Sequence, residues 1–257
     1  MTTPNNTVKA NPFKQLLRLA GAGVLVAMLQ GCASGPNANP ADPLEPFNRG
    51  VFSFNDGVDR AVLRPLASAY RDIAPSPVRT GVSNFFGNIS DVWSLVNNVL
   101  QLKPKESAET LMRISFNTIF GFGGVFDLAS EMRLQKHSED FGQTLGYWGV
   151  GPGPYVVLPL LGPSNLRDTV GTAVDVNTDL VNRLRNVPTR NSLAGLRVVD
   201  TRANLLGAGD VVEQAALDKY SFTRDAYLQR RRSLIGRESA EAQERYDLPE
   251  SAAPAAK

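Results

Sequence analysis

The side chains best suited to covalent or metal chemistry are scarce in this chain. Its 257 residues include one cysteine, Cys32, and one histidine, His137. A single cysteine cannot form an intramolecular disulfide, and one cysteine with one histidine is too few for a zinc site of the Cys/His type. Neither a His-Glu-x-x-His motif nor a phosphate-binding loop occurs. We therefore predict no metal ion and no cofactor.

The single histidine lies in a charged run, residues 133–140. A serine hydrolase needs a serine, a histidine and an acid in contact, commonly with the serine in a Gly-x-Ser-x-Gly turn. The sequence lacks this turn, and a histidine among charged loop residues is usually solvated. We predict no catalytic residue and interpret the chain as a protein that is not an enzyme.

Cys32 follows a segment with the features of an export signal. The apolar run Leu19–Leu29 has eleven residues, whereas a membrane-spanning helix needs about 20. A basic start, a short apolar stretch and small residues after it are typical of a secretory signal peptide. A buried core helix is the less favoured alternative. Ahead of the run there is no acid, and there are three cations: Lys9, Lys14 and Arg18.

The four residues Leu29-Gln30-Gly31-Cys32 resemble the lipobox of bacterial lipoproteins. The resemblance implies cleavage between Gly31 and Cys32, a diacylglyceryl group on the Cys32 sulfur and a further acyl chain on the new amine. This chemistry requires cysteine because a thiolate is the competent nucleophile. Residues 1–31 are therefore expected to be a lipoprotein signal peptide.

Residues 32–41 are expected to form an acylated tether. One acyl chain binds a membrane only marginally, with a constant of about 10⁴ M⁻¹, so three chains would make a permanent anchor. The glycine, proline and alanine residues after Cys32 are typical of a flexible linker. By the same resemblance Ala33, in place of aspartate, implies sorting to the outer membrane.

The rest of the chain predicts a mainly α-helical body. No later stretch reaches about 18 consecutive apolar residues, so no second candidate for a spanning helix exists. Pro65 is expected to end or bend the first helix, and Ser164 to cap a later one. The Gly/Pro-rich segment 146–163 cannot be helical, and residues 236–257 are expected to be a disordered tail. Apolar side chains recur at helical spacing over 47–62, 82–100, 104–120, 166–184, 196–206 and 221–234.

The amphipathic helices leave two arrangements open. In a soluble protein such stripes pack on a common core. These stripes are rich in phenylalanine and tryptophan, as helices at a membrane interface are, and the anchor would hold the body at a membrane. Some helices would then turn their apolar faces to lipid and their polar faces inward.

Several ordered motifs occur between residues 42 and 235, nearly all of the expected body. They include Asp42-Pro43-Leu44-Glu45-Pro46-Phe47-Asn48-Arg49, Val82-Ser83-Asn84-Phe85-Phe86-Gly87-Asn88, Glu139-Asp140-Phe141-Gly142-Gln143-Thr144-Leu145-Gly146, Gly151-Pro152-Gly153-Pro154-Tyr155 and Arg224-Asp225-Ala226-Tyr227. Together these motifs resemble the VacJ/MlaA family of phospholipid-binding outer-membrane lipoproteins, and the resemblance covers residues 42–235.

The resemblance implies a ring-like, membrane-embedded helical body in the inner leaflet of the outer membrane of a Gram-negative bacterium. A polar channel would let mislocalised phospholipids descend from the outer leaflet, which maintains lipid asymmetry. The implied partners are these phospholipids as transported ligand, a trimeric porin and a soluble periplasmic lipid carrier.

Two groups of residues are candidates for such a channel. Moving a charged headgroup through hydrocarbon is costly, so the path must offer polar groups. The Asn-rich helix faces are candidate linings, namely Asn48, Asn55, Asn84 and Asn88. By resemblance, the break at Gly121, Gly123 and Gly124 begins a hairpin loop that gates the channel. An ordinary turn is an equally open interpretation.

Two other functions remain as alternatives. A structural, porin-associated envelope lipoprotein without transport would also explain the anchor and the helices. A lipid hydrolase is less favoured because the catalytic motifs are missing. The formal net charge of +2 gives no broad electrostatic reason to bind nucleic acid. Removal of the three signal-peptide cations would leave one more acidic than basic side chain.

Overall fold

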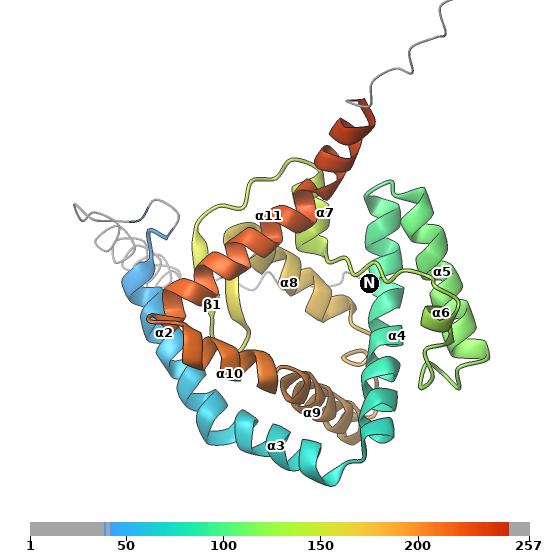
Figure 1. Ribbon diagram of the computed structural model, residues 1–257, viewed down its shortest axis with the longest axis horizontal. Coiled ribbons are helices and arrows are strands. Elements are labelled where there is room, and N and C mark those ends of the chain that lie inside the picture. Colours follow the sequence, from blue (N-terminus) through green and yellow to red (C-terminus); the bar gives the residue numbers. More distant parts are fainter. Residues whose placement is uncertain (1–38, 40–41, 247–257) are drawn as a thin grey trace, which may run out of the picture.

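The computed structural model describes residue 39 and residues 42–246 (Figure 1). The expected signal peptide at 1–31, Cys32 with most of the tether, and residues 247–257 lie outside the described residues. Within them the chain is mainly helical, as predicted, with one two-stranded sheet.

The first helical stretch does not end at Pro65. Helix α2 (Glu45–Val58) runs into a π-helical turn, η1 (Asp59–Leu63), and then into α3 (Arg64–Ile73). Pro65 lies in the first turn of α3. A proline cannot donate the backbone hydrogen bond of a continuing α-helix, and the α-helical pattern changes to π just before it.

A hairpin of two long helices follows. Helix α4 (Ser76–Leu100) packs along α5 (Pro104–Ile119), whose first position is a proline, where a missing N–H costs nothing. The short α6 (Leu128–Glu131) packs on α5. Residues 132–140, which we call the α6–α7 segment, then lead to α7 (Phe141–Tyr147).

The Gly/Pro-rich segment contains a β-hairpin. Strand β1 (Tyr155–Leu158) pairs antiparallel with β2 (Gly162–Asn165), and the turn uses positive φ at Leu160 and Gly162. The segment is therefore less irregular than its glycine and proline content suggested, although it is not helical, as expected.

Helix α8 (Leu166–Thr178) begins after Asn165, not after Ser164. The Asn165 Oδ1 accepts from the Asp168 backbone N at 2.8 Å and so caps the helix. Ser164 lies in β2, where its Oγ is 3.0 Å from the Thr169 hydroxyl. Both residue types suit a cap, and strand pairing decides which of them stands at the helix start.

Three helices complete the described chain: α9 (Val187–Asn204), α10 (Leu206–Ala215) and α11 (Lys219–Tyr246). The expected disordered tail from residue 236 is wrong for 236–246, because α11 continues to Tyr246. This stretch has few apolar residues, which suggested disorder, but its alanine, glutamate, glutamine and arginine residues are good helix formers.

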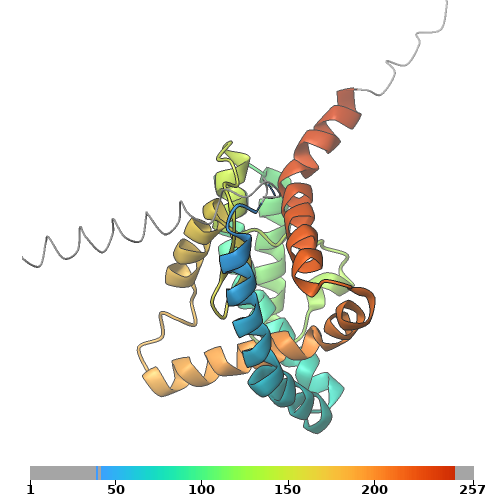
Figure 2. The same ribbon diagram turned by 90° about the vertical axis from the view of Figure 1, so that its left-hand side faces the viewer.

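The helices form a frame in which the other elements lie. In Figure 1, α2 and α3 occupy the left and bottom, α4 and α5 the right, and α11 crosses the top. The β-hairpin, α8 and α9 lie between them, and Figure 2 shows α11 extending away from the body at its C-terminal end. Among residues 42–246, none of the helices combines the length and the hydrophobicity that a transmembrane span requires.

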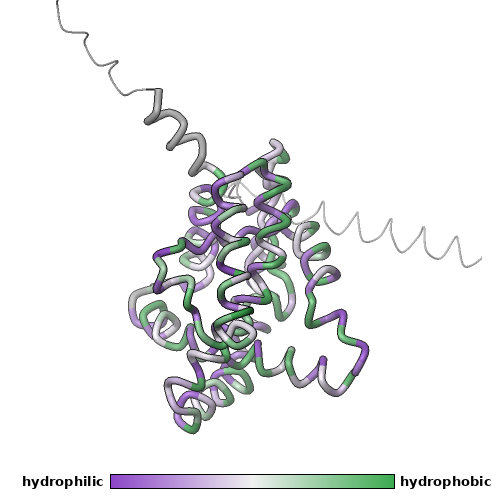
Figure 3. The backbone as a smooth tube through the Cα atoms, turned by 90° about the vertical axis from the view of Figure 1, so that its right-hand side faces the viewer, coloured by the Kyte–Doolittle hydropathy of each residue, from purple (hydrophilic) through white to green (hydrophobic). Residues whose placement is uncertain are grey.

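The distribution of polar and apolar side chains is inverted relative to a soluble protein. In the described part of the chain, nine hydrophobic residues are buried, against 19 polar or charged ones, and 33 large hydrophobic side chains are exposed. Figure 3 shows hydrophilic and hydrophobic residues alternating along the helices that it colours. Exposed apolar surface on this scale marks contact with lipid or protein. It favours the second of the two arrangements above, with polar faces inward.

Helix α4 shows this inversion most clearly. Its buried residues include Asn88, Asp91, Asn97 and Asn98, whereas its apolar Val99 is 56% exposed. The buried amides are held partly by α7, since the Thr144 hydroxyl donates to the Asn97 Oδ1 at 2.7 Å. The polar stripe of α4 therefore makes contacts with neighbouring elements, while Val99 and Leu100 at the end of its apolar stripe are exposed.

A small apolar cluster joins the β-hairpin to α2 and α11. Tyr155 and Val157 of β1 pack against Tyr220 of α11, with Phe52 of α2 beside them. The Phe52 and Tyr220 rings meet edge-on at 5.6 Å, a favourable aromatic geometry. This cluster fixes α11 on α2 and thereby closes the frame.

Candidate functional site

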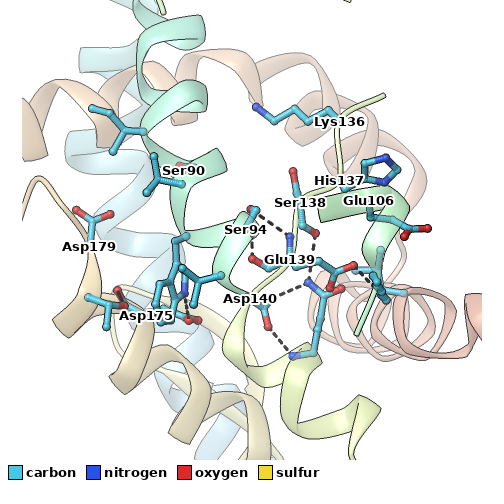
Figure 4. Close-up of a pocket in the computed structure, with 18 of the residues that line it drawn as sticks. Ser90, Ser94, Glu106, Lys136, His137, Ser138, Glu139, Asp140, Asp175 and Asp179 are labelled. Carbon is cyan, nitrogen blue, oxygen red and sulfur yellow. Dashed lines mark hydrogen bonds and ion pairs between the residues drawn. The ribbon is translucent and has the colours of Figure 1, made fainter. Parts of the chain in front are cut away.

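A cavity of about 1010 Å³ opens between α4, the α6–α7 segment, the end of α8 and α11. In Figure 4, Lys136 and His137 lie on one side of it, Asp175 and Asp179 on the other, and Ser90 between them on α4. Its lining includes cations, acids, hydroxyls and apolar side chains.

The α6–α7 segment forms one wall and is fixed to α4. The Glu139 backbone N donates to the Ser94 Oγ at 3.2 Å, while the Glu139 carboxylate accepts from the Gln101 Nε2 and the Lys103 Nζ, both at 3.2 Å. The Gln101 amide and the Glu139–Lys103 ion pair are largely buried. These bonds satisfy the polar groups of an irregular segment that would otherwise be costly to bury.

Asp175 of α8 lies in the opposite wall. Its Oδ1 accepts from the Trp93 Nε1 at 2.7 Å and from the Phe141 backbone N at 3.1 Å. Burial raises the pKa of this carboxyl, although both hydrogen bonds favour its charged form. Asp175 thus ties α4 and the start of α7 to α8.

Beside it, Asp179 accepts from the Arg197 Nη1 at 2.5 Å. The Arg197 Nη2 donates to the Ser90 Oγ at 2.9 Å, and the guanidinium lies 6.0 Å from the centre of the Phe86 ring. One arginine of α9 therefore connects the end of α8 with α4 at the cavity.

Arg231 closes the cavity from α11. Its Nη2 donates to the Asp140 Oδ1 at 2.9 Å and its Nε lies 2.8 Å from the Asp168 Oδ2. The Tyr227 hydroxyl donates to the same Asp168 oxygen at 2.6 Å. Burial acts to raise the pKa of Asp168, but the bonds from Tyr227 and Arg231 outweigh it and lower this pKa.

Apolar side chains complete the lining. Ile89, Val92 and Val96 contribute from α4, Leu180 from the end of α8 and Leu234 from α11. A cavity with charged and apolar groups together suits an amphiphile, since it can pair a polar headgroup and still contact hydrocarbon.

Asn48 and Asn55, which are predicted to line a channel, hold the β-hairpin. Asn48 is fully buried, and its amide donates to the Tyr155 carbonyl at 3.0 Å and accepts from the Val157 N at 2.9 Å. Asn55 donates to the Leu158 carbonyl at 2.9 Å. Both amides replace a missing strand partner of β1.

Asn84 and Asn88 hold the turn after α5. The Asn84 amide donates to the Val125 carbonyl at 3.1 Å, and that of Asn88 to the Thr118 hydroxyl at 2.9 Å. The four asparagines are absent from the cavity lining. Each of them makes hydrogen bonds between elements, and the lining of a channel by these asparagines stays a prediction.

The glycine break is a tight turn that requires glycine. A Cβ at Gly121 would lie 2.3 Å from the Phe126 carbonyl oxygen, and one at Gly124 would lie 2.5 Å from the Asn88 Cβ. Gly123 and Gly124 have φ of 72° and 95°, which glycine adopts without strain. The proposed gating by this turn stays a prediction.

A buried ionic network that the sequence analysis did not identify fixes the segment after this turn. The Arg113 side chain is 2% exposed, and its Nη2 lies 3.0 Å from each carboxylate oxygen of Asp127. Its Nη1 donates to the Leu134 carbonyl at 2.6 Å. Asp91 lies 3.8 Å from the Arg113 Nε and 3.2 Å from the Lys136 Nζ.

The sequence contains a signal for this network. Thr110, Arg113 and Asn117 recur at helical spacing on the face of α5 opposite its apolar stripe, and all three are buried. The cavity lining was missed for a similar reason, since the run 133–140 was interpreted as solvated. Asp175 and Asp179 lie one helical turn apart in the sequence, and this spacing was a second signal that could have indicated part of the cavity lining.

His137 lies at the edge of the cavity, where its Nε2 is 2.6 Å from the Glu109 carboxylate. No serine hydroxyl is within hydrogen-bonding distance of its ring in the described structure. Between residues 42 and 246 no three His, Cys, Asp or Glu side chains are grouped as metal ligands would be.

Comparison with known proteins identifies the family. The family model described as MlaA lipoprotein matches residues 40–234. The "Intermembrane phospholipid transport system lipoprotein MlaA" of Escherichia coli and that of Shigella flexneri are each 39% identical over 220 residues, 83% of this chain and 87% of the relative. The Haemophilus influenzae protein of the same name is 33% identical over 210 residues, 78% of this chain and 83% of its own.

A solved structure agrees with these relatives. It is described as "Structural basis for maintenance of bacterial outer membrane lipid asymmetry", and it superposes with a TM-score of 0.66 at 37% identity, covering 76% of this chain and 98% of that one. The helical architecture, the matched family model and the relatives together show that this chain belongs to the MlaA lipoprotein family.

Proposed function

We propose that the chain removes mislocalised phospholipids from the outer leaflet of the outer membrane, passes them through the cavity described above, and so maintains lipid asymmetry. Relatives that share most of its length are named as lipoproteins of intermembrane phospholipid transport. The observation that carries the proposal is a cavity of about 1010 Å³ lined by both charged and apolar side chains.

The physical problem in this transport is the headgroup. A phospholipid has an apolar part that is stable in hydrocarbon and a charged part that is not, because an unpaired charge is costly to bury. The cavity offers cations, carboxylates and hydroxyls to the headgroup. The exposed apolar side chains of α2, α4 and α5 suit a surrounding membrane, including Phe54, which is 55% exposed.

The same proposal includes the membrane anchor of the protein and its two protein partners. The body is held at the periplasmic side of the outer membrane by acyl chains on Cys32, where it is associated with a trimeric porin. A soluble periplasmic carrier receives the lipid.

A matched pair of substitutions tests the cavity as the lipid site. Val96 lines the cavity and Val99, one turn later in α4, is exposed outside its lining. We expect Val96→Trp to lower the amount of phospholipid that co-purifies with the detergent-extracted lipoprotein, and Val99→Trp to leave it unchanged. Equal phospholipid content in both variants and the wild type would exclude the cavity as the binding site.

A further inference from the structure

The cavity carries an imbalance of charge. Its lining includes seven lysine or arginine side chains and five aspartate or glutamate side chains. Four of the cations are neutralised by carboxylates. These ion pairs are Lys103–Glu139 at 3.2 Å, Lys136–Asp91 at 3.2 Å, Arg197–Asp179 at 2.5 Å and Arg231–Asp168 at 2.8 Å.

The other three cations have no acidic partner within the described residues. They are Lys105 on α5, Arg183 after α8 and Arg230 on α11. Arg183 makes one hydrogen bond, from its Nε to the Asn177 carbonyl at 3.2 Å. Three separate elements therefore bring exposed cationic groups to one cavity, and the fold supplies no carboxylate for them.

The acids of the lining do not offset these cations. Glu139, Asp140 and Asp179 are already engaged by cations. Asp175 accepts from the neutral N–H groups of Trp93 and Phe141, which leave its charge uncompensated. Glu106 has no hydrogen-bond or ion-pair partner in the part of the chain that the structure describes, so two uncompensated acids stand against three uncompensated cations. The unneutralised charge of the cavity is therefore positive.

We propose that the cavity selects phospholipids with a net negative headgroup, such as phosphatidylglycerol, over zwitterionic ones such as phosphatidylethanolamine. The inference rests on the proposed function. A phosphodiester accepts charge-assisted hydrogen bonds from arginine and lysine. A zwitterionic headgroup adds an ammonium group next to this phosphate, which the unpaired cations repel, whereas a glycerol headgroup adds only hydroxyls.

The apolar part of the lining indicates a lipid instead of a free anion. Val92 and Leu180 lie in the same cavity as Arg183. Inorganic phosphate would gain the charge contacts alone, while a lipid would also bury apolar surface. Binding of phosphate alone at comparable affinity would assign the cavity to a free anion and overturn the inference.

The chain offers a matched control for the charge of the cavity. Arg185 and Arg232 are exposed, lie two residues from Arg183 and Arg230, and are not part of the lining. The double variants Arg183→Glu/Arg230→Glu and Arg185→Glu/Arg232→Glu change the net charge equally on the same two elements. All four positions are exposed, so we expect both variants to fold, which circular dichroism checks.

The experiment is calorimetric titration of the lipidated protein, in a neutral detergent at low salt, with short-chain phosphatidylglycerol, short-chain phosphatidylethanolamine and inorganic phosphate. We expect wild type to prefer phosphatidylglycerol, and Arg183→Glu/Arg230→Glu to bind it about tenfold or more weakly, as loss of one charge-assisted hydrogen bond predicts. The control variant should keep wild-type affinity. High salt should weaken phosphatidylglycerol binding in particular.

Two results would overturn this selectivity while leaving the transport function intact. One is equal wild-type affinity for the two lipids, and the other is an equal loss of phosphatidylglycerol affinity in both double variants. If neither lipid binds to the wild type, the proposed function itself fails along with the selectivity.

Discussion

The Arg113 guanidinium and the Asp127 carboxylate form an ion pair with two contacts of 3.0 Å from one nitrogen. Arg113 belongs to α5, and Asp127 caps α6 after the glycine turn. The same arginine reaches the Leu134 carbonyl at the start of the cavity wall. One buried side chain therefore fixes both the turn and the α6–α7 segment to the helical hairpin.

Loss of this arginine should destabilise the protein strongly. Arg113→Met leaves the carboxylates of Asp91 and Asp127 without their shared partner, and breaking a buried pair by removing one member costs roughly 3–5 kcal/mol. The measurement is the free energy of unfolding in denaturant, in detergent solution. Arg185→Met, at an exposed position, should change it by less than about 0.5 kcal/mol. Equal stability of the two variants would contradict the role assigned to Arg113.

Asp127 should make stability depend on acid pH. Burial acts to raise its pKa, but hydrogen bonds from Ser130 and Asn117 and the charge of Arg113 outweigh it and hold the pKa at about 2. Because the folded pKa lies below the unfolded one, the stabilisation is complete above about pH 4 and is lost as pH falls through 2. Its size is at most about 2 kcal/mol, since the side chain is 28% exposed.

The measurement is the free energy of unfolding of wild type and Asp127→Asn between pH 2 and pH 6. The difference between the two free energies should shrink as pH falls, because the side chain at position 127 is uncharged in the variant at every pH, while titrating groups that do not interact with Asp127 contribute equally to both proteins. A difference that stays constant over this range would contradict a lowered pKa at Asp127.

The sequence was sufficient to predict the helices and their amphipathic character. It was not sufficient to predict which face of each helix is buried. The polar stripe of Asn88 and Asp91 on α4 is visible as a spacing. Its burial is not, because it depends on Arg113 of α5 and Lys136 of the α6–α7 segment, which only the folded hairpin brings to it. Residue preferences for helix capping were also insufficient where two adjacent residues both suit a cap. The sequence predicted Ser164 as the N-cap of α8, but strand β2 extends to Asn165, which caps the helix.

The cavity was harder to predict than the fold. Its cations come from separate elements and show no common motif, as Lys105 and Arg230 illustrate. Charged residues at such spacing are normally solvated, so sequence alone favoured a surface interpretation. The asparagines are ambiguous in the sequence for another reason, since an amide suits a strand edge, as at Asn48, as well as a channel lining, which stays a prediction for them.

The glycine turn should be sensitive to its backbone conformation. Gly123 has φ of 72°, and a proline, fixed near −65°, cannot adopt it. We expect Gly123→Pro to alter lipid flow, measured as phospholipid in the outer leaflet and as the barrier function of the outer membrane. Gly50→Ala, in α2 with open space around its Cβ position, is the control. If Gly123→Pro is expressed normally and the outer membrane keeps a normal barrier function, this turn does not gate lipid flow.

Cys32 should determine location but not folding. Cys32→Ser removes the only thiol of the chain, and hydroxyl nucleophilicity is too low for the thioether step. We expect a folded protein that lacks acyl chains and is lost from the outer membrane, detected by intact mass and membrane fractionation. Correct sorting of an unacylated Cys32→Ser protein would disprove the anchor.

The most direct test blocks the cavity. Because acylation would consume Cys32, the only cysteine, an introduced thiol can be labelled alone. Ser138 lines the cavity on the α6–α7 segment, whereas Ser233 is an exposed residue of α11 outside the lining. Ser138→Cys and Ser233→Cys, each labelled with a bulky maleimide, are compared for removal of phospholipid from the outer leaflet. We expect the label to stop removal at position 138 and not at position 233, and undiminished removal with Ser138→Cys fully labelled would show that lipid does not pass through this cavity.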